Sequence, residues 1–386
     1  MLQGQLRIYE ERRKLMARRG DEIDSLLKDL NKFTPEGSSK PIALRGSDFG
    51  RINAIPCFSP AVAYLLAVGG WPEGKLVEFF GKEHSGKSSF ALMALKDCYD
   101  YYGGERMVAY IDLEHRFNPE WAEKLGLKVD DSLIVIQPPD AETGTDMMVR
   151  LIKSKQICAI VWDSVGAAAT KHSMQELNDK NDKVGGNASV MKRNVQTVAP
   201  LANLYNVTCF YLNQLRQDMD GYNRPMTPGG NAVKHAMSVR VYLRPGSDKY
   251  FDKVDGENVQ VGFPIVMKTV KNSYGPPFRE GWTDFYNQPC KNLDHPGIDV
   301  DRDLARMGIL LGVVQRQGAW FSWKDIKAQG RDAFFELVWS SGRKEEFESE
   351  IVATVKKGAQ QVEVEDDEFF GRPLTVDSVD IHDSEV

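Results

Sequence analysis

Cysteine is scarce in this chain, and long apolar runs are missing. The 386 residues include five cysteines, which lie far apart and form no Cys-x-x-Cys or Cys/His cluster. This excludes a disulfide framework and the usual zinc-site spacings. No run of about 18 apolar residues occurs, and the amino terminus is charged where a signal peptide would need an apolar stretch. We therefore expect a globular cytoplasmic protein.

Acidic residues gather at the carboxyl terminus. Residues 361–386 hold nine acidic side chains against the single basic residue Arg372, a balance of −8. Because the whole chain carries −6, the remainder carries +2. An acidic tail on a slightly basic body is compatible with a tail that competes with nucleic acid for a cationic surface. A disordered terminus that only aids solubility fits equally well.

The spacing of apolar residues divides the chain into four predicted parts. Residues 1–45 include an amphipathic stretch over 4–33, which predicts a helical segment. Its apolar stripe packs either on its own domain or on a neighbouring subunit, and we assign it as an oligomerisation segment. Residues 46–295 form the main domain, residues 296–358 a small carboxyl-terminal lobe, and residues 359–386 an acidic disordered tail.

Short apolar runs alternate with helical stretches from Leu76 onward. The runs LVEFF, MVAYIDLE, SLIVIQ, ICAIVWDS and VTCFYLNQL are separated by helices expected at 88–102, 119–126, 142–154 and 187–204. Strands that are apolar almost throughout and alternate with helices are typical of a parallel sheet covered on both faces. Later runs, VRVYLRP, PIVMKTVKNS and WTDFYN, follow one another without a helix. The sequence therefore predicts an α/β fold whose mostly parallel sheet ends in antiparallel strands.

A glycine-rich segment follows the first of these strands and opens a helix. Gly81-x-x-x-x-Gly86-Lys87-Ser88 matches the phosphate-loop pattern. Glycines let backbone N–H groups wrap phosphates, the lysine reaches the outer phosphates, and the serine hydroxyl binds Mg²⁺. The predicted cofactor-binding residues of this segment are Gly81, Glu83, His84, Ser85, Gly86, Lys87, Ser88 and Ser89.

Polar side chains end three further strands. Asp163 closes ICAIVWDS, where a carboxylate can orient Mg²⁺ at the carboxyl edge of the sheet. YIDLEH offers Glu114 or Asp112 as the base beside an attacking water, and their spacing places both on one strand face. FYLNQL brings Asn213 and Gln214 to the same rim, where an amide could sense a terminal phosphate.

These segments, together with PGGNAVKHAMSVR, VMKTVKNSYGPPF and GAWFSW, resemble the RecA-type homologous recombinases from about Gly74 to Trp323, roughly two thirds of the chain. The resemblance implies a RecA-like P-loop NTPase core with ATP and Mg²⁺ as cofactors. It also implies a DNA-dependent ATPase that polymerises on single-stranded DNA with ATP at subunit interfaces, pairs it with homologous duplex DNA and exchanges strands. Single-strand-binding and loading proteins would be partners in a bacterial or phage-infected cell, and the divergent loops favour a phage or remote relative.

The resemblance also assigns roles around the phosphates. Lys87 and Ser88 bind phosphates and Mg²⁺, with Glu83 in the loop, and Asp163 is the acid that orients the metal. Glu114, in preference to Asp112, activates the water.

Other assignments concern the base and the neighbouring subunit. Trp121 falls where the family stacks an aromatic ring on adenine, and Asn118 replaces the usual acidic side chain that contacts this base. Lys271 corresponds to the first of two lysines that the neighbour contributes, whereas Ser273 replaces the second. This departure weakens the expected stabilisation of transition-state charge by the neighbour.

Two long polar stretches, 169–186 and 215–230, match the DNA-binding loops of the family by position. Gln214 would be the γ-phosphate sensor that opens the second loop, and His235 stands where relatives carry an aromatic at the subunit interface. Acidic residues offset the basic ones in both loops, so backbone amides and apolar wedges should matter for binding. Met174 and Met226 are the candidate wedges, and packing within the loop is the alternative for either, more so for Met174. The DNA-binding candidates are Met174, Arg216, Tyr222, Arg224, Met226, Gly229, Gly230 and Asn231.

The segment GAWFSW belongs to the predicted carboxyl-terminal lobe, which gathers duplex DNA in the family. Trp320, Phe321 and Trp323 predict a half-buried strand. Two other functions stay open. A replicative helicase shares the phosphate loop and strand-end acid but would carry a larger amino-terminal domain. An ATP-gated DNA-coating scaffold with negligible turnover would fit the missing second lysine, although Glu114 argues against it.

Overall fold

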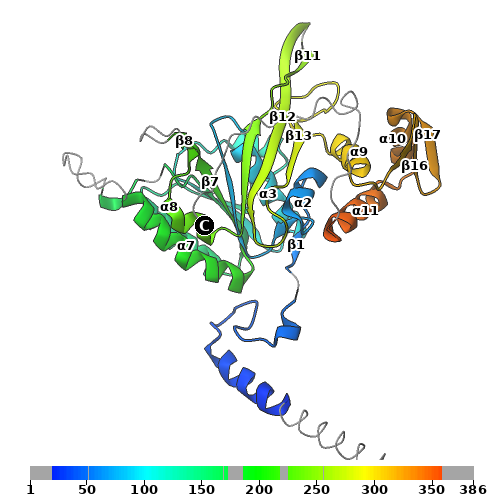
Figure 1. The fold of residues 1–386 in the computed structure, drawn as a ribbon. Coiled ribbons are helices and arrows are strands. Elements are labelled where there is room, and N and C mark those ends of the chain that lie inside the picture. Colours follow the sequence, from blue (N-terminus) through cyan, green and yellow to red (C-terminus); the bar gives the residue numbers. More distant parts are fainter. Residues whose placement is uncertain are drawn as a thin grey trace, which may run out of the picture.

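The computed structural model describes residues 20–50, 52–167, 169–172, 186–217, 225–254 and 256–358. Its largest sheet has ten strands, ordered β14-β13-β12-β10-β3-β7-β6-β4-β5 with β11 paired to β12 (Figure 1). The strands are β3 (Leu76–Gly81), β4 (Met107–Asp112), β5 (Leu133–Ile136), β6 (Ile157–Asp163), β7 (Thr208–Gln214), β10 (Val239–Pro245), β11 (Tyr250–Val254), β12 (Glu257–Asn272), β13 (Glu280–Tyr286) and β14 (Gly297–Ile298).

The sheet has a parallel half and an antiparallel half. Strands β3, β7, β6, β4 and β5 pair in parallel, and β10 extends this half by pairing in parallel with β3. On its other edge β10 pairs antiparallel with β12, which is followed by β13 and β14 in antiparallel order. The predicted fold class is confirmed. The parallel half matters for function because the carboxyl ends of its strands meet at one edge.

Helices cover both faces of the parallel half (Figure 1). They are α3 (Lys87–Tyr101), α4 (Pro119–Lys124), α5 (Ala141–Lys153), α7 (Gly186–Tyr205) and α8 (Gly230–Ala236), whereas α2 (Pro60–Leu66) packs on β12 and β13 of the antiparallel half. On one face α3 packs through Phe90 against Phe79 and Phe210, two rings stacked 5.8 Å apart. On the other face Trp162 shares a core with α5 and α7. Alternate side chains of each strand therefore enter two separate apolar layers. In the described part of the chain, no helix has the length and apolar character needed to cross a bilayer.

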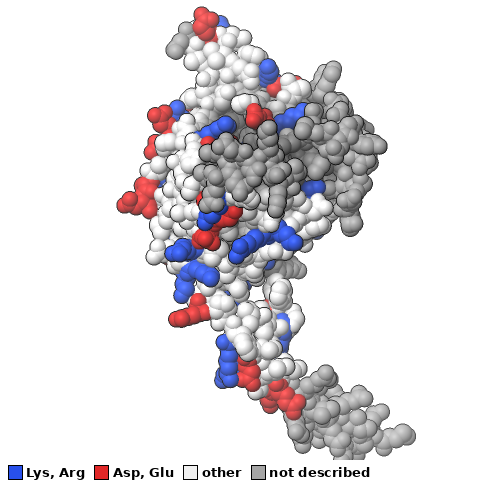
Figure 2. Space-filling view, turned by 90° about the vertical axis from the view of Figure 1, so that its left-hand side faces the viewer, with Lys and Arg blue, Asp and Glu red and all other residues white. Residues whose placement is uncertain are grey.

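The amino-terminal segment lies outside the globular body. Residues 20–30 are helical and a 3₁₀ turn follows at Asn31–Phe33, whereas the predicted helix over 4–19 falls outside the described residues. Figure 1 shows this segment projecting away from the sheet, and Figure 2 shows it extending below the rest of the surface. Its tether includes the Ser39 N–H, which donates to the Leu204 carbonyl at 2.7 Å. Several of its apolar side chains are solvent-exposed: Ile23, Leu26, Leu30, Phe33, Ile42, Leu44 and Phe49.

The carboxyl-terminal lobe contains a small antiparallel sheet among three helices. The elements are α9 (Val300–Leu310), β15 (Gln315–Gln317), β16 (Trp320–Trp323), β17 (Ile326–Gln329), α10 (Arg331–Ser340) and α11 (Lys344–Lys356). The predicted half-buried strand is β16, in which Phe321 and Trp323 are buried while Trp320 is 46% exposed. Phe321 packs near Phe334, and Trp323 meets Phe347 edge to face.

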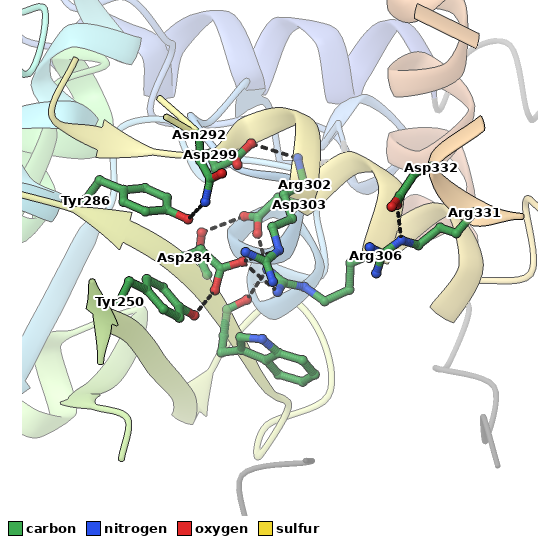
Figure 3. Close-up of polar contacts among 12 residues, drawn as sticks. Tyr250, Asp284, Tyr286, Asn292, Asp299, Arg302, Asp303, Arg306, Arg331 and Asp332 are labelled. Atoms are coloured by element: carbon green, nitrogen blue, oxygen red, sulfur yellow. Dashed lines mark hydrogen bonds and ion pairs between the residues drawn. The ribbon is translucent and has the colours of Figure 1, made fainter. Parts of the chain in front are cut away.

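A buried polar network joins this lobe to the sheet (Figure 3). Arg306 of α9 pairs with Asp303 of the same helix and, at 3.4 Å, with Asp284 of β13. Asp303 also accepts hydrogen bonds from the hydroxyls of Ser59 and Thr283. Since both carboxylates are almost fully buried, each needs these partners to offset its loss of hydration. The network fixes α9 against the core.

Candidate functional site

The phosphate loop joins β3 to α3 as the sequence predicts. Gly86 caps the helix with φ of 89°, in the left-handed region that glycine tolerates. The Lys87 ammonium folds back over the loop and donates to the carbonyls of Gly81 (3.1 Å) and Lys82 (2.6 Å) and to the Ser85 hydroxyl (3.3 Å). Burial lowers the pKa of Lys87, and nearby carboxylates oppose this effect.

Close packing explains both glycines of the loop. A Cβ atom on Gly81 would lie 2.1 Å from the Leu243 carbonyl oxygen, and one on Gly86 would lie 2.6 Å from Ile265 Cδ1. The intervening Glu83 and His84 are exposed, whereas Ser85 is buried. The loop is thus a tight backbone turn around a cation, which fits an anionic polyphosphate.

The two acidic candidates at and just after the end of β4 lie in different surroundings. Glu114 Oε1 accepts hydrogen bonds from the Ser164 hydroxyl at 2.6 Å and from Gln214 Nε2 at 3.3 Å. Asp112 is 1% exposed and accepts from the Phe117 N–H and from Gln137 Nε2, each at 2.9 Å. The strand ends at Asp112, so the chain turns before Glu114 and the two carboxylates do not share a strand face. The expectation of a common face was wrong.

Asp163 ends β6 beside this pair. Tyr110 Oη donates to its carboxylate at 2.5 Å. Burial raises the pKa of Asp163 to about 6, with further upward contributions from Glu114 and Asp112 that Tyr110 and Lys87 oppose. A cation beside such a carboxyl group would stabilise its ionised form.

The residues present fit a magnesium ion that is also bound to phosphate. Among the described residues no group of three potential metal-binding side chains occurs. Mg²⁺ in nucleotide sites usually keeps several waters and is held by one or two protein oxygens plus phosphates. Ser88 at the start of α3 and Asp163 at the end of β6 are the candidates to supply these oxygens.

Sequence reasoning missed Tyr110 as a partner of this site. Its contact with Asp163 arises from the parallel register of β4 and β6, in which Asp112 is opposite Asp163. A tyrosine two residues before the end of a strand carries no such signal by itself. It becomes informative once the two strands are known to be neighbours.

The predicted base-binding residues lie together next to the loop. Asn118 Oδ1 accepts from the Trp121 N–H at 3.0 Å and caps α4. The indole Nε1 of Trp121 donates to Ser89 Oγ at 3.1 Å, which joins α4 to the first turn of α3. The structure therefore brings Asn118 and Trp121 to the phosphate loop.

Asn213 and Gln214 point in opposite directions. Gln214 reaches Glu114, whereas Asn213 is fully buried and donates to Glu78 Oε1 at 2.8 Å. Successive residues of a strand face opposite sides of the sheet. The sequence placed both amides at the same rim, and this holds only for Gln214.

Lys271 lies elsewhere within the protomer. Its ammonium donates to the carbonyls of Lys234 (3.0 Å) and His235 (2.8 Å) in the last turn of α8. In the part of the chain that is described, no hydrogen bond or ion pair joins it to the phosphate loop. Ser273 donates its N–H to the Ser238 carbonyl at 2.9 Å.

The second loop begins and ends as a hairpin. β8 (Arg216–Gln217) pairs antiparallel with β9 (Pro225–Met226), so Arg216 is opposite Met226. Met174, Tyr222 and Arg224 lie outside the described residues.

Helix α8 follows this hairpin at once. Gly229 and Gly230 have φ of 94° and 70°, and the exposed Asn231 lies in its first turn. Figure 2 views the molecule from the side on which Figure 1 draws α7 and α8, and it shows acidic as well as basic side chains there. The described part of this surface is therefore not uniformly cationic.

Comparisons with known proteins agree with this geometry. A family model described as the RecA N-terminal domain matches residues 21–289. Protein RecA of Porphyromonas gingivalis is 32% identical over 310 residues, covering 79% of this chain and 85% of the relative. Protein RecA of Bacteroides thetaiotaomicron is 34% identical over 318 residues, covering 81% and 91%. A mitochondrial DNA repair protein recA homolog of Dictyostelium discoideum is 31% identical over 317 residues, covering 80% and 65%.

Proposed function

The chain belongs to the RecA family of homologous recombinases, and on that premise we propose which of its residues carry out ATP hydrolysis and couple it to DNA. The protein is a DNA-dependent ATPase that forms filaments on DNA and exchanges strands in recombination and repair. Bound ATP supplies the phosphoanhydride bond, and Mg²⁺ neutralises charge on its phosphates.

Lys87 and Ser88 hold the nucleotide at the start of α3. The ammonium of Lys87 exchanges its loop carbonyls for phosphate oxygens, a stronger charge-assisted interaction. Ser88 and Asp163 hold Mg²⁺, and Tyr110 keeps the Asp163 carboxylate in place through its hydrogen bond. Trp121 and Asn118 contact the base, because Trp121 bonds Ser89 in the first turn of α3 and Asn118 is held to Trp121.

Glu114 orients and deprotonates the attacking water. The observation that carries this role is the contact of Glu114 with both Ser164 and Gln214, which places a carboxylate of known orientation beside the sensor amide. Asp112 serves to hold the turn through Phe117 and Gln137 instead. Gln214 can report on the nucleotide because its amide already lies between the water-activating group and the second loop.

A neighbouring subunit completes the site. Lys271 lies on β12 away from the loop of its own protomer, which is consistent with service to the next one. The amino-terminal segment presents Leu26 and Phe33 to solvent, the latter 79% exposed, and these would be covered by another copy. We assign segment 1–45 as the oligomerisation element, residues 46–295 as the ATPase core and residues 296–358 as the lobe that gathers duplex DNA.

DNA is bound at the carboxyl edge of the parallel strands. The two loops follow Ser164 and Gln214, and both residues contact Glu114. A change at Glu114 when the nucleotide binds can therefore reach both loops. The hairpin Arg216–Met226 and the backbone amides of Gly229, Gly230 and Asn231 supply contacts that need no base sequence. The outer loop residues Met174, Tyr222 and Arg224 belong to the same proposed surface.

Paired substitutions test the assignment of the base. Glu114→Gln should retain ATP and single-stranded DNA but lower turnover by at least about 100-fold, the usual contribution of a general base. Asp112→Asn is the matched control, because both hydrogen bonds that Asp112 accepts end on Oδ2 and an amide oxygen can take them over, while the NH₂ group in place of the buried, unpartnered Oδ1 costs stability, which thermal unfolding records separately from turnover. Phosphate release with and without single-stranded DNA measures the effect. Normal turnover in Glu114→Gln with loss in Asp112→Asn would reverse the assignment.

A further inference from the structure

Glu78 is a carboxylate with no place in the nucleotide chemistry described above. It lies in the middle of β3, the strand that ends in the phosphate loop, and it is fully buried. A buried charge must be paired, and such pairs seldom add net stability compared with apolar side chains of similar volume. Its position in the centre of the sheet therefore points to a role other than net stability.

The first partner of Glu78 leads to the second loop. Asn213 Nδ2 donates both to Glu78 Oε1 at 2.8 Å and to the Pro228 carbonyl at 3.0 Å. Asn213 Oδ1 accepts from the Gln214 N–H at 3.0 Å, so its amide orientation is fixed. One oxygen of Glu78 thus holds the backbone of Pro228 through a single intermediate.

The second partner leads to the neighbouring residue of the same loop. Arg240 on β10 pairs through Nε with Glu78 Oε2, and its NH2 group donates to Thr227 Oγ1 at 3.2 Å. The guanidinium lies 4.8 Å from the centre of the Phe80 ring, which limits its rotation. Arg240 and Thr227 are 5% and 7% exposed, so water does not compete for these bonds.

Both chains of contacts end at the same place. Thr227 and Pro228 follow the 218–224 stretch of the second loop and directly precede Gly229, the cap of α8. We propose that Glu78 is a positioning residue, which fixes the return end of this loop to the strand that carries the phosphate loop and so couples nucleotide binding to DNA binding. The Asn213–Glu78 contact lies on one face of β7, and the contact between Gln214 and Glu114 lies on the opposite face. This relay through Glu78 rests on the proposed function of the second loop.

Thr227→Val tests the relay with little change of volume. The substitution removes the oxygen that accepts from Arg240 and leaves the Glu78 pair intact. We expect the gain in single-stranded DNA affinity on adding a non-hydrolysable ATP analogue to fall about tenfold, the size of one lost hydrogen bond to a charged group. Affinity for the analogue without DNA should match that of the unmodified chain.

Two further variants separate coupling from structure. Thr145→Val is the matched control, because Thr145 is also a buried threonine that accepts a hydrogen bond, from Asn194 at 3.0 Å, but lies on α5. Its nucleotide-dependent gain should be normal. Arg240→Lys retains the charge beside Glu78 but cannot bond Glu78 and Thr227 together, so it should lose the gain as Thr227→Val does.

The possible results give distinct conclusions. An unchanged gain in both Thr227→Val and Arg240→Lys would make the network purely structural and overturn the proposal. Equal weakening with and without nucleotide would make Thr227 a simple DNA-loop support and would also overturn it. If the unmodified chain bound DNA no better with the analogue, the proposed function itself would fail, and the relay with it.

Discussion

Asp97 offers the most direct test of the energetics of this fold. It lies on α3, the helix that begins at the phosphate loop, and its Oδ2 accepts hydrogen bonds from the Trp71 indole and the Phe58 N–H, each at 2.8 Å. Burial raises its pKa from 3.8 to about 7, against the opposing effect of these two bonds. Asp97→Asn replaces the carboxyl by an amide whose oxygen can accept both bonds.

The sign of the effect follows from proton linkage. The folded protein holds the Asp97 proton up to about pH 7, whereas the unfolded chain releases it near 3.8. Stability from this group is therefore fully present below pH 3.8 and is lost as the pH rises through 7. The loss is about 1.4 kcal/mol per pH unit, or about 4 kcal/mol in all. The variant lacks this loss, although its buried NH₂ group costs roughly 1–3 kcal/mol at every pH.

Urea unfolding between pH 5 and 8.5 measures the difference. The stability of Asp97→Asn minus that of the unmodified chain should grow by about 3 kcal/mol from pH 5 to pH 8. Asp163 and Asp303, whose pKa values are also raised, to about 6, are present in both proteins and cancel. Asp100→Asn is the control, since Asp100 is half exposed on the same helix. A difference that stays constant with pH would refute the reasoning.

Three further predictions concern the site, assembly and the tail. Lys87→Ala should abolish nucleotide-dependent DNA binding, because it removes the ammonium that lies over the loop and is proposed to bind the phosphates. Normal filaments by electron microscopy would contradict this. Leu26→Asp with Phe33→Asp should weaken self-association in sedimentation by about tenfold or more, by removing apolar surface from the subunit contact, while nucleotide affinity stays normal. Deleting residues 361–386 should raise duplex DNA affinity most at low salt, where the −8 charge is least screened. Equal affinity at all salt concentrations would leave the tail as an aid to solubility.

The sequence predicted the parallel half of the fold closely because its signals are local. Apolar runs, the glycine pattern and the helix starts agree with β3, α3, β6 and β7 to within one or two residues. The misses are non-local. Tyr110 meets Asp163 only through strand register, and Glu114 separates from Asp112 only because the chain turns where β4 ends.

The antiparallel half shows the same limit. Nothing in the run VRVYLRP states that β10 also pairs in parallel with β3, and this pairing is what places Arg240 beside Glu78. Burial of the pair follows from two strands that are distant in sequence. The lobe likewise gave one strand signal, from its aromatic residues, because β15 contains no apolar residue and the alternation of β17 extends over only four residues.

On the proposed role of segment 1–45 as the subunit contact, its exposed apolar side chains also govern how copies of this chain add to one another. Each added copy buries the same apolar surface, so every addition contributes the same free energy of association. Filament length should then rise smoothly with protein concentration. A chain without that segment should remain monomeric and should meet ATP with the phosphate loop alone, lacking the side chains that a neighbour would contribute.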